Sequence, residues 1–327
     1  MDDLRRLLLI INPVSGTRSK KGLDSRLVKR LASHGFDVDV SFTAQKGDAT
    51  LLAQKAVAEG YDGVLACGGD GTVNETARAM VGTGVAMGIL PAGSGNGLAR
   101  HIDLPIDAIK AADIIGRRNV RDCDYGTVNG HPFFCTFGLG FDAAVSDRFA
   151  SAASRGKMTY IRSALSEFLH YKAEPYTIVA DGEKIVDDAM LVAVCNANQY
   201  GNNAFIAPDA SITDGFLDLV VVRKMPKAGT LLMGTKMMAG TLAESSHLVT
   251  RKVRNVSVSR QTDGPAHLDG EPFDKAGTRI DIVCHPGALK LFTNDRKQPF
   301  KPFLTPLRAT VNDMTMSIRH LFSKKGG

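Results

Sequence analysis

The chain lacks tryptophan, and aromatic residues make up only 6% of its 327 positions. Proteins that bind single-stranded nucleic acid stack bases on aromatic side chains and on arginine, so this scarcity argues against a nucleic-acid partner. The 5 cysteines include no pair at two-residue spacing, which excludes the common zinc motifs. Their odd number favours the reduced, buried thiols of a cytoplasmic protein over a disulfide framework.

A long hydrophobic helix is also missing. The longest uncharged stretch, residues 80–99, contains several glycines and Pro91, which oppose a continuous membrane-spanning helix. The apolar run at residues 7–11 ends at Asn12-Pro13 and is too short for a signal peptide. We therefore expect a cytoplasmic protein whose contact with a membrane is peripheral. Its formal net charge of +6 favours anionic partners, such as phosphates or an anionic membrane surface.

The first third of the sequence alternates strand and helix patterns. Short apolar runs bounded by glycine, proline or polar residues predict strands, and apolar residues at helical spacing predict the helices between them. Such alternation indicates a parallel sheet covered by helices on both faces. The predicted strands are residues 7–12, 38–42, 63–67 and 85–90, and the predicted helices are residues 23–33, 48–58, 74–80 and 106–115.

The pattern changes near Asp122, where hairpin signals begin. Asn129-Gly130 and Asp181-Gly182 each lie between two strand-like runs, as in two-residue β-hairpins, so we expect an antiparallel, β-rich domain with helical insertions. Residues 314–322 predict an amphipathic helix that packs on the first domain or on a membrane surface. The predicted strands here are residues 126–128, 132–137, 176–180, 184–186, 190–196, 217–222, 253–259, 279–284 and 289–292, and the predicted helices are residues 160–171 and 228–240.

The segment Gly68-Gly69-Asp70-Gly71-Thr72 follows a predicted buried strand and opens a helix. Glycines at such a turn let backbone N–H groups approach a phosphate, and a helix N-terminus favours negative charge. Asp70 is unsuited to direct phosphate contact and is a candidate metal or water ligand, or a base. Loops at residues 12–16 and 91–97 follow two other strands of the same sheet. Because ligands of open α/β sheets bind at the carboxyl ends of strands, the three loops predict one polar site.

No Walker loop of the form GxxxxGK[ST] is present, which excludes a P-loop kinase. The order NPVSG, GGDGTVNE, PAGSGNGLAR and LDGEP instead resembles the diacylglycerol kinase catalytic-domain superfamily, which also contains sphingosine kinases, ceramide kinases and the bacterial YegS-like lipid kinases. The resemblance covers nearly the whole chain. It implies an ATP- and Mg²⁺-dependent kinase that phosphorylates the hydroxyl of a diacylglycerol-like lipid, or that of a sphingoid base or ceramide.

The resemblance also implies the fold class, α/β. It comprises an N-terminal three-layer α/β nucleotide-binding domain and a β-rich, antiparallel-sandwich lipid-binding domain, with the active site in the interdomain cleft. We expect the ATP-binding domain at residues 1–123 and the lipid-substrate domain at residues 124–287, with residues 288–327 returning to the first domain. The implied partners are the lipid substrate and an anionic membrane surface. The sequence leaves open whether the chain forms a homodimer.

Two carboxylates are candidates for catalysis. Glu271, in the segment Leu-Asp-Gly-Glu-Pro, matches the carboxylate proposed as general base in bacterial diacylglycerol kinases. In sphingosine kinases, that role is often given to the residue that matches Asp70. We expect Glu271 to be the base and Asp70 to belong to the metal–water network. By the same resemblance, the nucleotide would be held by Asn12, Pro13, Val14, Ser15, Gly16, Thr43, Gly68, Gly69, Asp70, Gly71, Thr72, Val73, Asn74 and Ser94.

Residues 208–216 resemble the structural magnesium loop of the bacterial enzymes. Asp214 would provide a carboxylate to the metal, and Ser211 and Phe216 would provide backbone oxygens. Asp124 would join the network indirectly, by hydrogen bonds. Oxygen-only ligands are those that Mg²⁺ prefers.

Several alternatives remain open. The third loop reads Gly-Ser-Gly-Asn-Gly, which is closer to long-chain-base kinases than to many bacterial diacylglycerol kinases. The region after Phe141 nevertheless lacks a clear match to the acidic residue that meets a sphingoid amine, and Asp142 and Asp147 match it imperfectly. NAD kinases also use Gly-Gly-Asp-Gly, although residues 91–96 and 268–272 favour the lipid branch. The third alternative, a catalytically silent nucleotide- or lipid-binding regulator, is disfavoured by the intact carboxylates.

Overall fold

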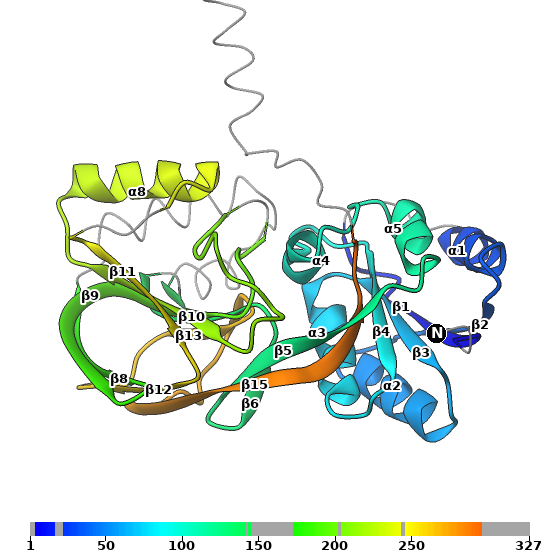
Figure 1. Ribbon diagram of the computed structural model, residues 1–327, viewed down its shortest axis with the longest axis horizontal. Helices are drawn as coiled ribbons and strands as arrows, with labels where there is room; N and C mark the ends of the chain where they lie inside the picture. The colour runs from blue at the N-terminus through cyan, green and yellow to red at the C-terminus, as the bar shows by residue number, and fades with distance from the viewer. Residues whose placement is uncertain are drawn as a thin grey trace, which may run out of the picture.

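The computed structural model describes residues 4–16, 22–141, 143–144, 173–201, 204–242 and 246–295. This part of the chain forms two lobes joined by long strands (Figure 1). The predicted helices at residues 160–171 and 314–322 lie outside the described residues. Within the described part, no helix is long and apolar enough to span a bilayer.

The first lobe is a parallel sheet between two layers of helices (Figure 1). Its elements are β1 (Arg6–Ile11), α1 (Leu23–Ala32), β2 (Asp37–Phe42), α2 (Asp48–Ala58), β3 (Gly63–Gly68), α3 (Asp70–Met80), β4 (Ala86–Pro91), α4 (Gly97–His101) and α5 (Ala108–Ile115). The strand order is β2-β1-β3-β4. One face of the sheet packs on α2 and α3, and the other packs on α1 and α5. Strand β3 is consequently buried along its whole length, as its apolar sequence predicts.

The second lobe is built from antiparallel strands. Its elements are β5 (Val120–Val128), β6 (His131–Phe133), β7 (Thr136–Gly140), β8 (Glu174–Ala180), β9 (Glu183–Cys195), β10 (Leu217–Arg223), α8 (Lys227–Ala239), β11 (Leu248–Val253), β12 (Asn255–Arg260), β13 (Ala266–Leu268), β14 (Glu271–Pro272) and β15 (Arg279–Phe292). Alternate residues of β9 and β10 face the core of this lobe, and the intervening residues pack against a second cluster that includes Met233 and Met237 of α8. The two lobes together confirm the predicted α/β fold class.

Strand β15 runs from one lobe into the other. It pairs with β12 and β5 in the second lobe, and Leu291 pairs with Met87 of β4 in the first. The sequence predicts two separate strands here, interrupted by Pro286. The structure instead has one strand whose register against β5 shifts between His285 and Leu289. A bulge of this kind accommodates a proline that a regular ladder would exclude.

Other elements differ from prediction in extent. The predicted strands 184–186 and 190–196 form the single strand β9, because the polar residues between them still pair with β8 through their backbones. The predicted strand 132–137 is divided into β6 and β7, since the amides between them bind a carboxylate described below. Strand β11 and the short helix α4 were not predicted, and α3 begins at Asp70, earlier than predicted.

Candidate active site

The three glycine-containing loops follow β1, β3 and β4, which are neighbours in the sheet. Backbone and side-chain hydrogen bonds join them directly. The amide of Asn12 donates to the carbonyl of Cys67 (2.9 Å), and its side chain donates to the Thr72 hydroxyl (3.1 Å). The amide of Ala92 donates to the carbonyl of Gly68 (2.8 Å). The predicted convergence of these loops therefore occurs in the structure.

Glycine is required where these loops touch. A Cβ atom at Gly93 would overlap the Cα atom of Gly69, and one at Gly16 would overlap the carbonyl oxygen of Ala92. Gly16 also has a φ of 71°, a left-handed conformation that side chains rarely adopt. The loops consequently lie backbone to backbone. Glycine-containing backbone of this kind is what phosphate-binding loops use, because their N–H groups must come close to the anion.

Asp70 connects the second loop to the third. Its carboxylate accepts hydrogen bonds from the amides of Asn96 (2.9 Å) and Gly97 (2.7 Å), one on each oxygen. Burial raises the pKa of the Asp70 carboxyl, and these two amides act in the opposite direction. In this structure, Asp70 thus fixes the backbone of the third loop. Its predicted part in a metal–water network remains a prediction.

The other residues predicted to bind nucleotide differ in their positions relative to the loops. Thr43 is buried at the end of β2, and its amide donates to the carbonyl of Ile11 (3.0 Å), so it lies beside the first loop. Val14 and Ser94 are exposed at the tips of their loops. Val73 and Asn74 are instead buried, and Val73 packs in the apolar core. These two are consequently better placed to support the second loop than to contact a ligand.

Glu271 reaches this site from the second lobe. It begins β14 after the tight turn Asp269-Gly270, whose φ values of 51° and 82° fit a type I′ hairpin turn. A Cβ atom placed on Gly71 would lie 3.3 Å from Glu271 Oε1, so the carboxylate lies against the first turn of α3. Its other oxygen accepts from Lys46 Nζ at 3.1 Å. The structure thus brings the predicted base to the predicted phosphate loop.

Asp269 holds that hairpin in place, a role that no sequence pattern indicates. Its buried carboxylate accepts hydrogen bonds from three successive amides, those of Phe134 (3.0 Å), Cys135 (2.7 Å) and Thr136 (2.9 Å). Burial raises the pKa of the Asp269 carboxyl, and the hydrogen bonds from the same three amides act to lower it. The Asp-Gly turn can be predicted from the sequence. The distant segment that the Asp269 side chain binds cannot.

The predicted magnesium loop lies beside the bulge of β15. Asp124 is buried, and its two carboxylate oxygens accept from the amides of Gly215 and Gly287, each at 2.7 Å. The Asp124 amide donates to the carbonyl of Ile212 (2.6 Å). Asp124 therefore attaches the loop to the strands that join the lobes, in keeping with its predicted indirect role.

The donor chemistry of this loop suits Mg²⁺, since it consists of oxygens only. The Asp214 carboxylate, however, already has a cationic neighbour. Lys252 Nζ lies 2.8 Å from Asp214 Oδ2 and 2.9 Å from Asp218 Oδ2. Among the described residues, no three His, Cys, Asp or Glu side chains gather into a metal-binding group. A divalent cation at Asp214, with backbone oxygens of Ser211 and Phe216, would therefore compete with the Lys252 ammonium.

Replacing Lys252 with methionine is expected to strengthen divalent-cation binding at this loop. In the unchanged protein, millimolar Mg²⁺ should alter the melting temperature little, because Asp214 is already neutralised. In Lys252→Met, the same Mg²⁺ should raise it by a few degrees, and adding Asp214→Asn should remove that gain. Differential scanning fluorimetry without nucleotide measures the effect. An equal Mg²⁺ response in the unchanged protein and Lys252→Met would contradict the competition.

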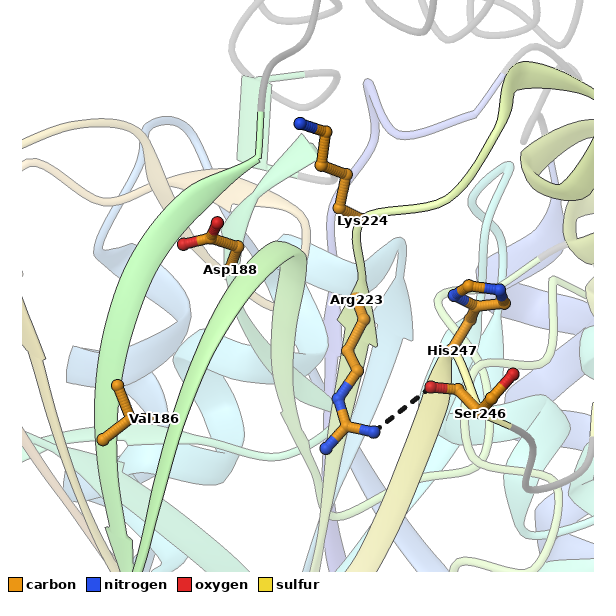
Figure 2. Close-up of a pocket in the computed structure, with 6 residues that line it drawn as sticks. All are labelled: Val186, Asp188, Arg223, Lys224, Ser246 and His247. Atoms are coloured by element: carbon orange, nitrogen blue, oxygen red, sulfur yellow. Dashed lines mark hydrogen bonds between the residues drawn. The ribbon is translucent and has the colours of Figure 1, made fainter.

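The pocket in Figure 2 lies elsewhere. It is lined by Val186, Asp188, Arg223, Lys224, Ser246 and His247, and Arg223 donates to the carbonyl oxygen of Ser246 at 3.1 Å. None of the predicted site residues borders it. This pocket is therefore separate from the predicted site.

Two family models match successive parts of the chain. The diacylglycerol kinase catalytic domain matches residues 6–128, and the YegS C-terminal NAD kinase beta sandwich-like domain matches residues 136–293. A diacylglycerol kinase of Mycobacterium tuberculosis (strain CDC 1551 / Oshkosh) is 31% identical over 264 residues, which cover 78% of this chain and 85% of that protein. A diacylglycerol kinase of Bacillus subtilis (strain 168) is 28% identical over 273 residues, with coverage of 82% and 90%.

Solved structures resemble this chain over most of its length. The crystal structure of a diacylglycerol kinase from Bacillus anthracis str. Sterne has a TM-score of 0.71 at 21% identity, covers 90% of this chain and 99% of that chain, and so shares the fold. A second structure from the same strain has a TM-score of 0.75 at 25% identity, covering 90% and 98%. The predicted resemblance is confirmed: the chain belongs to the diacylglycerol kinase catalytic-domain family of lipid kinases, with a YegS-type C-terminal domain.

Proposed function

We propose that this protein transfers a phosphoryl group from ATP to the hydroxyl of a diacylglycerol-like lipid, with Mg²⁺. The observation that carries the proposal is the position of Glu271. Its carboxylate lies against the first turn of α3, where the three glycine-containing loops meet. A phosphate-binding site and a partly exposed carboxylate, contributed by different lobes, are the parts that a kinase with an alcohol acceptor needs.

In the proposed reaction, backbone N–H groups of the three loops bind the ATP phosphates. The acceptor hydroxyl lies beside Glu271, which takes its proton as the oxygen attacks the γ-phosphorus and the bond to the β-phosphate oxygen breaks. The products are a phosphorylated lipid and ADP. Bound Mg²⁺ would supply positive charge to the phosphates. Asp70 holds the third loop through the amides of Asn96 and Gly97, and Asp269 holds the hairpin that presents Glu271.

Diacylglycerol is the first choice of substrate because the M. tuberculosis and B. subtilis relatives are named diacylglycerol kinases. A sphingoid base or ceramide is the second, because the third loop reads Gly-Ser-Gly-Asn-Gly. We also propose the domain limits given above, with residues 1–123 binding ATP and residues 124–287 binding lipid. A cytoplasmic enzyme that docks on an anionic membrane surface fits the net charge of +6.

One experiment tests the substrate directly. The protein is incubated with labelled ATP, Mg²⁺ and vesicles that contain diacylglycerol, sphingosine, ceramide or phosphatidylglycerol, and the products are separated by chromatography. We expect label in phosphatidic acid, and no label when Mg²⁺ is removed with EDTA. Label only in a sphingosine or ceramide product would contradict diacylglycerol as the substrate but would still support a lipid kinase.

The remaining outcomes decide between the alternatives. Label in NADP after incubation with NAD, and in no lipid, would overturn the proposal in favour of an NAD kinase. Binding of ATP without transfer to any acceptor would favour a catalytically silent regulator. The Glu271 carboxylate beside Gly71 disfavours the silent regulator, because a regulator has no need of a base at that position.

A further inference from the structure

Lys46 lies in a turn that is tied to the phosphate-binding helix. The turn joins β2 to α2, and the Asp48 carboxylate fixes it by accepting from the amides of Ala44 (2.8 Å) and Gln45 (3.0 Å). Glu75 of α3 accepts from the Gly47 amide at 2.9 Å. The backbone that carries Lys46 is thus held relative to the helix that starts at Asp70.

The side chain of Lys46, in contrast, lies at the surface. It is 81% exposed and reaches across to Glu271, 225 residues away in sequence, with a separation of 3.1 Å. An exposed ion pair of this kind contributes about 0–1 kcal/mol to stability. The pair is therefore a weak stabiliser of the fold, and its importance lies in where it places an ammonium group.

That place is next to the start of α3, where the glycine-containing loops meet. Glu271 Oε1 lies beside Gly71 at the start of α3, and Glu271 Oε2 is the atom that Lys46 contacts. A phosphoryl group bound at this helix N-terminus, with its acceptor next to Glu271, would lie within reach of the same ammonium. The phosphoryl group carries more negative charge than one carboxylate. Lys46 can therefore leave Glu271 and pair with the phosphoryl oxygens instead.

We propose that Lys46 contacts the γ-phosphoryl group and stabilises the negative charge on its oxygens during transfer. This inference rests on the proposed kinase activity. Lys46 stays protonated throughout: the acceptor oxygen forms the new bond to phosphorus, ADP leaves with the electrons of the broken bond, and the hydroxyl proton goes to Glu271. Before ATP binds, Lys46 neutralises the Glu271 carboxylate. Once the γ-phosphate is present, the ammonium pairs with it and frees Glu271 to accept the proton.

Nucleotide binding tests the contact without catalysis. The affinities for ADP and for the non-hydrolysable analogue AMP-PNP are measured by calorimetry for the unchanged protein, Lys46→Met and Lys46→Arg. In Lys46→Met, we expect the affinity for AMP-PNP relative to ADP to fall about tenfold, because only the analogue has a γ-phosphate. Lys46→Arg should keep most of the affinity for AMP-PNP relative to ADP. The control is Lys55→Met on α2, whose exposed lysine pairs only weakly with Glu59 at 3.6 Å.

Transfer assays complete the test. Lys46→Met should lower kcat for lipid phosphorylation about a hundredfold, with partial recovery in Lys46→Arg and no change in Lys55→Met. An unchanged AMP-PNP to ADP ratio, or an unchanged kcat, would overturn the role of Lys46. Failure of the unchanged protein to phosphorylate any lipid would instead overturn the proposed function, and the two failures are distinguishable because nucleotide binding is measured separately.

Discussion

Replacing Glu271 with glutamine is expected to lower the rate of phosphoryl transfer about a thousandfold, while ATP binding and the fold are retained. Glutamine has nearly the same shape but cannot accept the hydroxyl proton, and general-base catalysis contributes roughly 10²–10⁴-fold. Glu271 is half exposed, and its ion pair with Lys46 lies at the surface, so the fold loses little. Labelled ATP with diacylglycerol vesicles measures the rate, and calorimetry measures ATP binding.

Glu59→Gln is a suitable control for this substitution. Glu59 is also exposed and also pairs with a lysine, Lys55, but it lies just after α2 and beside Arg6 at the start of β1, whereas the glycine-containing loops follow the ends of the strands. Transfer by Glu59→Gln should match that of the unchanged protein. If Glu271→Gln retained more than about a tenth of the transfer rate, the proton would have to go elsewhere, and Asp70 would become the candidate base.

Removing the Asp269 carboxylate is expected to cost about 3 kcal/mol or more of the free energy of unfolding, because three buried amides lose their acceptor at once. Asp269→Ala should also lower transfer strongly, since the hairpin that carries Glu271 is no longer attached to residues 134–136. Urea unfolding followed by circular dichroism measures the stability, and the vesicle assay measures the transfer.

The second lobe contains a matched control for Asp269. Asp181 begins an Asp-Gly turn of the same type, with φ of 47°, and its carboxylate also accepts backbone amides, from Arg254 (2.9 Å) and Asn255 (2.8 Å). This turn is exposed, so water can replace the carboxylate. Asp181→Ala should cost only about 1 kcal/mol and leave transfer unchanged. Equal losses in the two variants would contradict the importance of burial at Asp269.

The elements that the sequence predicted correctly depend on local patterns. The strands of the first lobe are apolar runs bounded by loops, and the glycines at 68–71 and 93–97 mark places where backbone must approach backbone. The carboxyl ends of parallel strands meet at one edge, so the meeting of the three loops followed from their positions in the chain. Glu271 was identified by its resemblance to a family motif, because a hairpin turn by itself does not indicate a base.

What could not be predicted depends on contacts between distant segments. Nothing near Asp269 in the sequence indicates that its partners are the amides of residues 134–136. Lys46 lies in a segment noted for Thr43, yet its approach to Glu271 requires the two lobes to be placed relative to each other. Lys252 lies in β11, which was not predicted at all, so its competition for Asp214 could not be anticipated.

The path of β15 determines when the protein can finish folding during synthesis. The parallel sheet of the first lobe is complete only when Leu291 joins Met87, and Phe292 fills the core beneath it. About 200 residues separate these strands, which at roughly 5–20 residues per second is on the order of ten seconds or more on the ribosome. Until then the edge of β4 stays open and apolar surface is exposed. The first lobe, although made before the second, therefore depends on the last described strand of the chain.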